Sequence, residues 1–159
     1  MKRLALALVL LAGPATARDA LGVYQGWGAF RDTTPRRCFA IAEPIRKGSE
    51  SWRPFASVAH WPLKRVRGQI HVRLSRAVQA GAAVSLSIDG RSFPMVAGGA
   101  DAWAPDPRTD AAIVAAMRSG QRMSIIAVGA PAGRFVDTYM LKGAATAIDA
   151  AALGCARGR

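Results

Sequence analysis

Few side chains in this sequence have the chemistry of a catalytic group. It contains two histidines, His60 and His71. A hydrolytic triad also needs a serine that a neighbouring base makes nucleophilic, and no G-x-S-x-G motif occurs. His60 stands beside Trp61 in an aromatic stretch, and the alternation of residues 69–75 puts His71 on a polar strand face, which predicts a solvated imidazole. The sequence therefore predicts no catalytic residue and no enzymatic activity.

Metal and cofactor sites are not predicted either. Zinc needs clustered ligands, in spacings such as C-x2-C, and the sequence offers none. Asp101, Asp106 and Asp110 suggest calcium, but their spacing does not match an EF-hand loop, and Asp106 is expected to cap a helix. The glycine pair in "VAGGADAW" precedes aromatic and acidic residues and lacks the context of a phosphate loop. No cofactor is predicted.

Residues 1–17 have the three parts of a secretory signal peptide. Basic residues near the start are followed by the apolar run 4–12 and by the cleavage motif A-T-A at 15–17. The alternative, a membrane anchor, is disfavoured because nine apolar residues fall well short of the roughly 20 that a spanning helix needs. We predict cleavage between Ala17 and Arg18, export to the periplasm or beyond the bacterial cell, and no transmembrane segment in the mature protein.

Export changes the interpretation of the two cysteines. Removal of 17 residues leaves 142 of the 159, enough for one domain with a real core, which we place at 18–159. Cys38 and Cys155 then form an even pair in an oxidising compartment, where disulfides form and persist. We predict a Cys38–Cys155 disulfide, with two unrelated buried thiols as the alternative.

Positive charge is the strongest compositional feature. The formal net charge is +12, from 22 basic and 10 acidic residues. Such a balance is typical of proteins with anionic partners, and equally of a surface whose scattered cations only solvate it. The longest basic groups do not reach the five or six consecutive charges of a basic tail. The candidate contacts to an anion are Lys64, Arg65, Arg67 and Arg73.

The elements that must position these residues are mostly strands. Asp89-Gly90 between two alternating runs predicts a type I′ hairpin. Pro54 within residues 51–61 predicts an edge or bulged strand, and residues 31–37 read as a polar loop. Strands are predicted at 24–30, 38–44, 51–61, 69–75, 84–88, 91–97, 121–128 and 134–141.

Two helices interrupt the strand pattern. Asp106-Pro107 predicts a helix start and Gly120 a helix end. An alanine-rich helix is predicted near the C-terminus, with one small-residue face consisting of Ala144, Ile148, Ala151, Ala152 and Cys155. The fold class that these elements predict is mainly β: an antiparallel β-sandwich of seven or eight strands with two short helices, one of them C-terminal.

Three blocks of the sequence carry a family pattern. They are "QGWGAFRD…RRCFAIAEP" near the start, "DAWAPDPRTDAAIVAAMRSGQRMSI" in the middle and "DTYMLKGAATAIDAAALGC" near the end. In this order they resemble the invasion-associated locus B family, exported proteins of alphaproteobacteria. The resemblance covers about residues 24–155. It implies an immunoglobulin-like β-sandwich, a periplasmic or surface location and no established enzymatic activity, with a role in host-cell invasion for some pathogens.

Three function classes remain open at this stage. The leading hypothesis is a non-catalytic exported module that binds a protein or envelope partner. The alternatives are a binder of an anionic glycan or lipid through the arginine-rich surface, without specific nucleic-acid recognition, and an envelope hydrolase that uses His60 beside a carboxylate. Trp27, Trp52, Trp61 and Trp103 are expected mainly in the core, with stacking on sugars or bases as the alternative.

Overall fold

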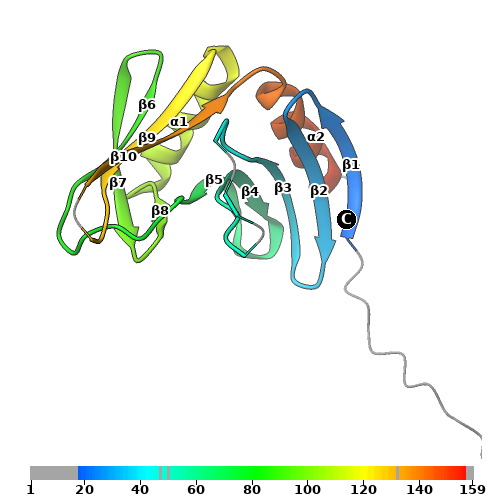
Figure 1. The fold of residues 1–159 in the computed structure, drawn as a ribbon. Helices are drawn as coiled ribbons and strands as arrows, with labels where there is room; N and C mark the ends of the chain where they lie inside the picture. Colours follow the sequence, from blue (N-terminus) through cyan, green and yellow to red (C-terminus); the bar gives the residue numbers. More distant parts are fainter. Residues whose placement is uncertain (1–17, 47, 50, 132, 157–159) are drawn as a thin grey trace, which may run out of the picture.

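The computed structural model describes residues 18–46, 48–49, 51–131 and 133–156. The predicted signal peptide, including Ala17, lies outside the described residues, whereas Arg18 is the first residue of the first strand. The described residues form ten β-strands, two α-helices and one short 3-10 helix (Figure 1). The strands are β1 (Arg18–Tyr24), β2 (Trp27–Thr33), β3 (Arg36–Ala42), β4 (Phe55–Trp61), β5 (Val66–Arg73), β6 (Val84–Ile88), β7 (Arg91–Gly98), β8 (Asp101–Trp103), β9 (Arg122–Val128) and β10 (Arg134–Met140). The helices are η1 (Pro62–Lys64), α1 (Pro107–Ser119) and α2 (Ala144–Ala156).

All ten strands belong to one antiparallel sheet, in the order β1-β2-β3-β4-β5-β8-β7-β6-β9-β10. The short strand β8 joins the two parts of this sheet, because it pairs with β5 on one side and β7 on the other. Figure 1 shows β1–β4 on one side of the molecule and β6, β7, β9 and β10 on the other. Buried residues from both parts form one hydrophobic core. The predicted mainly β, antiparallel fold with two helices, one of them C-terminal, is confirmed, and the two parts of a single continuous sheet supply its two layers.

One hydrogen bond connects strands that lie near opposite ends of the sheet order. The indole Nε1 of Trp27 in β2 donates to the backbone oxygen of Met140 in β10 at 2.9 Å. Nearby, the Ile45 N–H donates to the Thr138 oxygen at 2.7 Å. Trp27 is fully buried, so this bond and the packing around it hold the two parts of the sheet together over the core.

Strands with clear local patterns form where the sequence predicts them. Ile70, Val72 and Leu74 are buried, and the alternate β5 side chains face outward. Asp89 and Gly90 have φ angles of 46° and 90° at the turn between β6 and β7. Both positive values fit the predicted type I′ hairpin.

Other strand predictions were wrong or incomplete. The predicted polar loop at 31–37 is a tight hairpin, in which only Thr34 and Pro35 lie outside β2 and β3. β4 is not an edge strand, because it pairs with both β3 and β5, although its register does shift between Ala59 and Trp61 as a bulge would. Pro54 precedes the first residue of β4, so its missing N–H removes no bond from the ladder. β1 and β8 were not predicted at all.

Helix α1 begins and ends as predicted, and it also supplies a hydrogen-bond acceptor to the backbone of the sheet. The Asp106 side chain accepts a hydrogen bond from the Thr109 N–H at 2.9 Å and caps the first turn. On the next turn, Asp110 Oδ1 accepts the Ile70 N–H of β5 at 2.8 Å. Because β8 pairs only with residues 71–73 of β5, this carboxylate satisfies a backbone donor that the short strand leaves unpaired.

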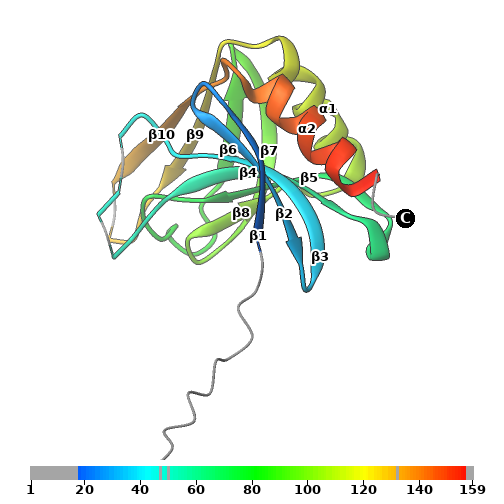
Figure 2. The same cartoon turned by 90° about the vertical axis from the view of Figure 1, so that its right-hand side faces the viewer.

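Helix α2 packs on β1–β4 and against α1, as Figure 2 shows. Its buried residues are Ala144, Ala147, Ile148, Ala151 and Cys155, so the predicted small-residue face is correct except that Ala147 replaces the half-buried Ala152. Gly143 precedes the helix with φ 91°, and its Cα lies against the backbone of Tyr24, where a Cβ would collide. Cys155 forms the predicted disulfide with Cys38 of β3.

Candidate functional site

The two histidines occupy different environments and have different partners. The ring of His60 accepts the Gly68 N–H on Nδ1 at 3.3 Å, and its Nε2 is buried with no partner among the described residues. Burial lowers the pKa of His60, and the positive charges of Arg67 and Arg118 lower it further. The neighbouring charges are therefore cationic, not the carboxylate that the hydrolase hypothesis needs.

His71 is not the solvated imidazole that the sequence predicts. Its Nε2 lies 2.8 Å from Asp101 Oδ1, and its ring is stacked on the ring of Trp103, with centroids 5.1 Å apart and planes 8° apart. Phe55 meets the same imidazole edge-on at 5.3 Å. The register explains this packing, because β5 and β8 place His71 directly opposite Trp103 on the outward face of the sheet.

We call Phe55, His71 and Trp103 the outer aromatic cluster. A serine does stand beside it, since β4 places Ser57 directly opposite His71. The Ser57 hydroxyl, however, donates to the backbone oxygen of His71 at 3.3 Å and does not engage the ring. Ser57 is therefore not hydrogen-bonded to the imidazole, and the His71–Asp101 pair acts as a brace for the aromatic rings.

Two of the four tryptophans are exposed, contrary to the expectation that they lie mainly in the core. Trp103 is 37% exposed and Trp52 is 36% exposed, whereas Trp27 is fully buried. Trp52 is anchored by its Nε1, which donates to the Leu74 oxygen at 3.0 Å. The sequence could not distinguish these positions, because tryptophan fits a core and a binding surface equally well.

The four candidate anion contacts do not converge on one site. Arg67 and Arg73 lie six positions apart on the same strand, a separation of roughly 20 Å at about 3.3 Å per residue. The Arg73 guanidinium instead covers the ring of Trp52, 4.8 Å from its centroid. Lys64, Arg65 and Arg67 remain together and exposed at the β4–β5 turn, where the Lys64 ammonium lies 4.9 Å from the Trp61 ring centroid. We call these three residues the turn cations.

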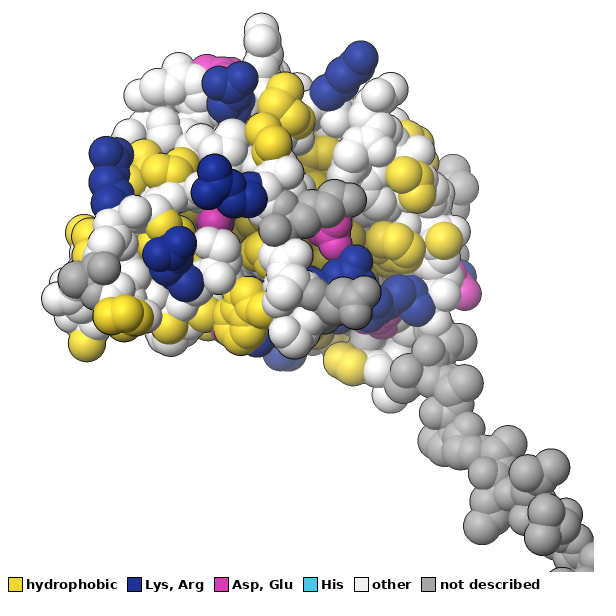
Figure 3. Space-filling model, in the orientation of Figure 1, with side chains coloured by type: hydrophobic (Ala, Val, Ile, Leu, Met, Phe, Trp, Pro, Cys, Tyr) yellow, Lys and Arg dark blue, Asp and Glu magenta, His cyan; other side chains and the backbone are white. Residues whose placement is uncertain are grey.

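Cationic side chains are also spread over other parts of the surface. Figure 3 shows dark blue side chains spaced apart among white and yellow ones on the face it presents. Several arginines are engaged by acids, as in the pairs Arg18–Asp32, Arg31–Asp19 and Arg118–Asp149. This distribution favours the hypothesis that scattered cations keep the surface solvated, and it disfavours a single large anion-binding region.

An apolar cavity of about 550 Å³ opens on the outward face near the first strands. The ion pair between Arg53 and Glu43, 2.8 Å long, lies at its margin. The lining residues are Val23, Gly26, Gly28, Phe30, Ile41, Ala42, Glu43, Pro44, Arg53, Pro54 and Phe55. Phe55 belongs both to this lining and to the outer aromatic cluster, so the cavity and the cluster adjoin on the outward face.

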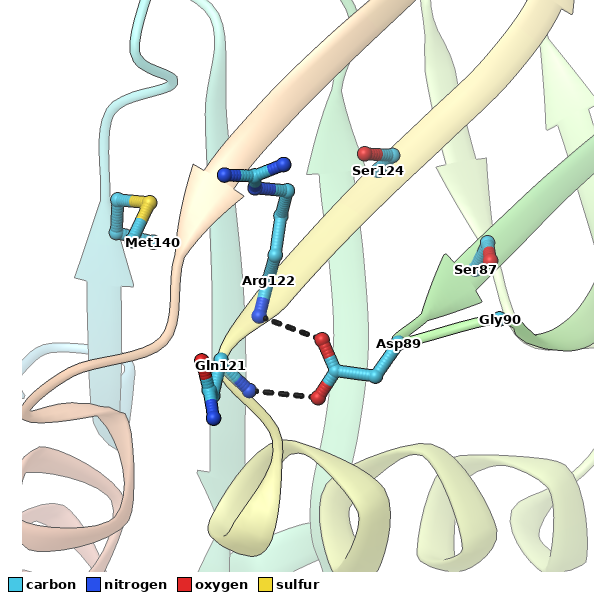
Figure 4. A pocket seen from close by; sticks show the side chains of 7 residues that line it. All are labelled: Ser87, Asp89, Gly90, Gln121, Arg122, Ser124 and Met140. Atoms are coloured by element: carbon cyan, nitrogen blue, oxygen red, sulfur yellow. Dashed lines mark hydrogen bonds between the residues drawn. The ribbon is translucent and has the colours of Figure 1, made fainter.

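A second, more polar cavity of about 430 Å³ lies over β6, β9 and β10. Its lining residues, all labelled in Figure 4, are Ser87, Asp89, Gly90, Gln121, Arg122, Ser124 and Met140. The Asp89 carboxylate accepts the backbone N–H groups of Gln121 and Arg122 at 2.7 and 3.1 Å. The guanidinium of Arg122 points away from that carboxylate (Figure 4). Sequence reasoning missed this site, and its only local signal was the alternation of serines in "VSLSI".

The three aspartates considered as calcium ligands have other roles. Asp101 braces His71, Asp106 caps α1, and Asp110 accepts the Ile70 N–H. Within the described part of the chain, no three histidine, cysteine or acidic residues are grouped as metal ligands. Among the helices of that same part, none is long and apolar enough to cross a membrane.

Comparison with known proteins supplies an independent finding. The family model described as "Invasion associated locus B (IalB) protein" matches residues 31–152. A crystal structure of invasion associated protein B from Bartonella henselae is similar, with a TM-score of 0.58 and 17% sequence identity, over 84% of this chain and 96% of that one. At this identity the likeness concerns the fold. No curated protein matches the chain.

Proposed function

The chain belongs to the invasion associated locus B family, and from this premise we propose that it is an exported, non-catalytic binding protein of the bacterial envelope. Its mature form is one domain, residues 18–159, acting in the periplasm or at the cell surface. The Cys38–Cys155 disulfide supports export, because such bonds form and persist in oxidising compartments. The partner is a protein or another component of the envelope or of a host surface.

The observation that carries the binding role is the outer aromatic cluster. Trp103 is 37% exposed, yet its ring is fixed by stacking on His71, which Asp101 holds in place. On the neighbouring strand, Val96 lies opposite Trp103 and is 55% exposed. Rigid aromatic rings beside apolar surface are what binding hot spots use, because little side-chain entropy remains to be lost when a partner covers them.

The absence of catalysis is supported by the roles of the polar groups in this region. Ser57 donates to a backbone oxygen, and Asp101 holds an imidazole that is also in edge-to-face contact with Phe55. These groups position the cluster and leave no paired nucleophile and base at it. Binding by the turn cations remains the alternative function, since these three side chains are exposed together.

Export is tested by intact-mass measurement of the protein from a periplasmic fraction. We expect a chain that starts at Arg18 and carries the oxidised disulfide. A chain that retains Met1 in that fraction would overturn the proposal of cleavage. Binding is tested by placing a photo-crosslinking residue in cells at position 96, opposite Trp103 on β7, and, as a control, at the exposed position 146 on α2.

A partner captured from position 96 should also be retained by the purified protein and lost with Trp103→Ala. Leu63→Ala is the matched control, because Leu63 is a large apolar side chain, 82% exposed, on a different part of the surface. Equal retention by Trp103→Ala and the wild-type protein would exclude the outer aromatic cluster as the binding surface.

A further inference from the structure

The cavity over β6, β9 and β10 has a row of hydroxyl groups along one side. Ser87 lies directly opposite Ser124, and Ser124 lies directly opposite Thr138 on the next strand. The hydroxyls of Ser124 and Thr138 are 3.3 Å apart. Neighbouring strands are about 4.8 Å apart, so three hydroxyl groups follow one another across three strands. Those of Ser87 and Ser124 line the cavity, at a spacing that suits a ligand carrying several hydroxyl groups of its own.

A cation stands at the end of this row. Arg122 is two residues before Ser124 on β9, and its side chain is exposed. Among the described residues, no carboxylate lies within ion-pair distance of its guanidinium. Both carboxylate oxygens of Asp89 are directed at backbone N–H groups, and Figure 4 shows the guanidinium on the opposite side of β9's start from that carboxylate. Arg122 can therefore bind one anionic group.

Met140 completes the cavity with an apolar contact. It lies directly opposite Arg122 in the β9–β10 register and is 48% exposed. A thioether side chain adapts its shape to an apolar surface. The three features together thus present hydroxyl groups, one positive charge and one apolar contact around a cavity of about 430 Å³, within the ~300–1,000 Å³ usual for small-molecule sites.

We propose that this cavity binds an acidic sugar, with Arg122 on its carboxylate or phosphate, Ser87 and Ser124 on its hydroxyl groups and Met140 against the C–H face of its ring. The lining contains no aromatic ring on which a nucleobase could stack. An acyl chain would be placed better in the apolar cavity beside Phe30 and Ile41. The inference deepens the proposed function, since it names a ligand class for a binding protein, and it uses a surface separate from the outer aromatic cluster.

The test is a titration of the mature protein with galacturonic acid, galactose 6-phosphate and neutral galactose, followed by backbone amide NMR shifts. We expect both acids to shift the amides of Ser87, Gln121, Arg122 and Ser124, and galactose to bind about tenfold more weakly or not at all. Comparison of galacturonic acid with galactose 6-phosphate shows whether the site prefers a carboxylate or a phosphate. No binding of either acid, or equal binding of galactose, overturns the proposal.

Variants separate the site from general charge effects. Arg122→Gln should weaken binding of the preferred acid about tenfold or more, whereas Arg134→Gln, which removes an equally exposed arginine at the other end of the β9–β10 pair, should leave it unchanged. Ser124→Ala should weaken binding of the preferred acid, and its melting temperature should stay within about a degree of that of the wild-type protein. Equal effects of Arg122→Gln and Arg134→Gln overturn the proposal. If Arg122→Gln retains the partner captured from position 96, a failure of the sugar site remains distinct from a failure of the proposed function.

Discussion

Cys155 in the last turn of α2 is bonded to Cys38 on the buried face of β3; the two residues are 117 positions apart in the sequence, and their Cα atoms are 5.7 Å apart. The bond fixes the end of a helix whose buried face consists mostly of alanine. Alanine contributes little apolar area per residue, so the hold of α2 on β1–β4 depends on close approach and on this covalent link.

Removing the disulfide should therefore cost substantial stability. We expect the double variant Cys38→Ala, Cys155→Ala to unfold at a lower denaturant concentration than the oxidised protein. Loop-closure entropy for more than a hundred residues corresponds to at most about 4–5 kcal/mol. Urea unfolding measures the change, and the wild-type protein in reducing agent serves as the control. An unchanged midpoint in both would contradict this role.

Substitution of Tyr139, by contrast, should make the protein more stable. Its side chain is fully buried, and its hydroxyl has no hydrogen-bond partner among the described residues. Burial, with the charge of Asp137, raises the pKa of Tyr139, so the phenol stays neutral. A buried unpaired hydroxyl costs about 1–3 kcal/mol, and Tyr139→Phe should raise the free energy of unfolding by up to that amount. A clear loss of stability would reveal a partner for the hydroxyl.

The protein should lose stability in mild acid through His60. Burial and the charges of Arg67 and Arg118 lower the pKa of His60 below its ordinary 6.5, so the unfolded chain binds this proton more readily than the folded one. Stability contributed by the neutral ring is therefore present above pH 6.5 and is lost as the pH falls below that value. The melting temperature of His60→Gln should depend less on pH between 7.5 and 5.5 than that of the wild type, and parallel curves would disprove the assignment.

Polyanion binding should be weak and diffuse. Arg73 covers Trp52 and lies far along β5 from the turn cations, so it adds nothing to them. We therefore expect a triple variant with serine in place of the turn cations to bind duplex DNA about as well as a control triple variant. The control has serine at Arg108, Arg134 and Lys142. The readout is the slope of log K against log salt, to which each neutralised phosphate contributes about 0.9. A slope reduced by about two to three units in the first variant alone would instead establish the turn cations as a site.

The sequence by itself determined the features that depend on neighbouring residues. The alternation of Ile70, Val72 and Leu74 specified which face of β5 is buried, and Asp89-Gly90 specified a hairpin turn. Asp106 and Pro107 specified the start of α1. Even the disulfide followed from counting two cysteines in a chain whose first residues predict a signal peptide. Backbone conformation and side-chain period are local properties, so a reading of consecutive residues reaches them.

Only the tertiary structure decided which distant residues meet. His71 and Trp103 stack because β8, a three-residue strand without a clear pattern of its own, pairs with β5 in one register. Likewise, Ser87 and Ser124 share a cavity with Arg122 because β6 pairs with β9, although β7, β8 and α1 separate these two strands along the chain. A shift of one residue in either register would turn these side chains to the other face of the sheet. Register is set by the packing of the whole core, and for that reason no local pattern, the serines of "VSLSI" included, could show which residues meet at either site.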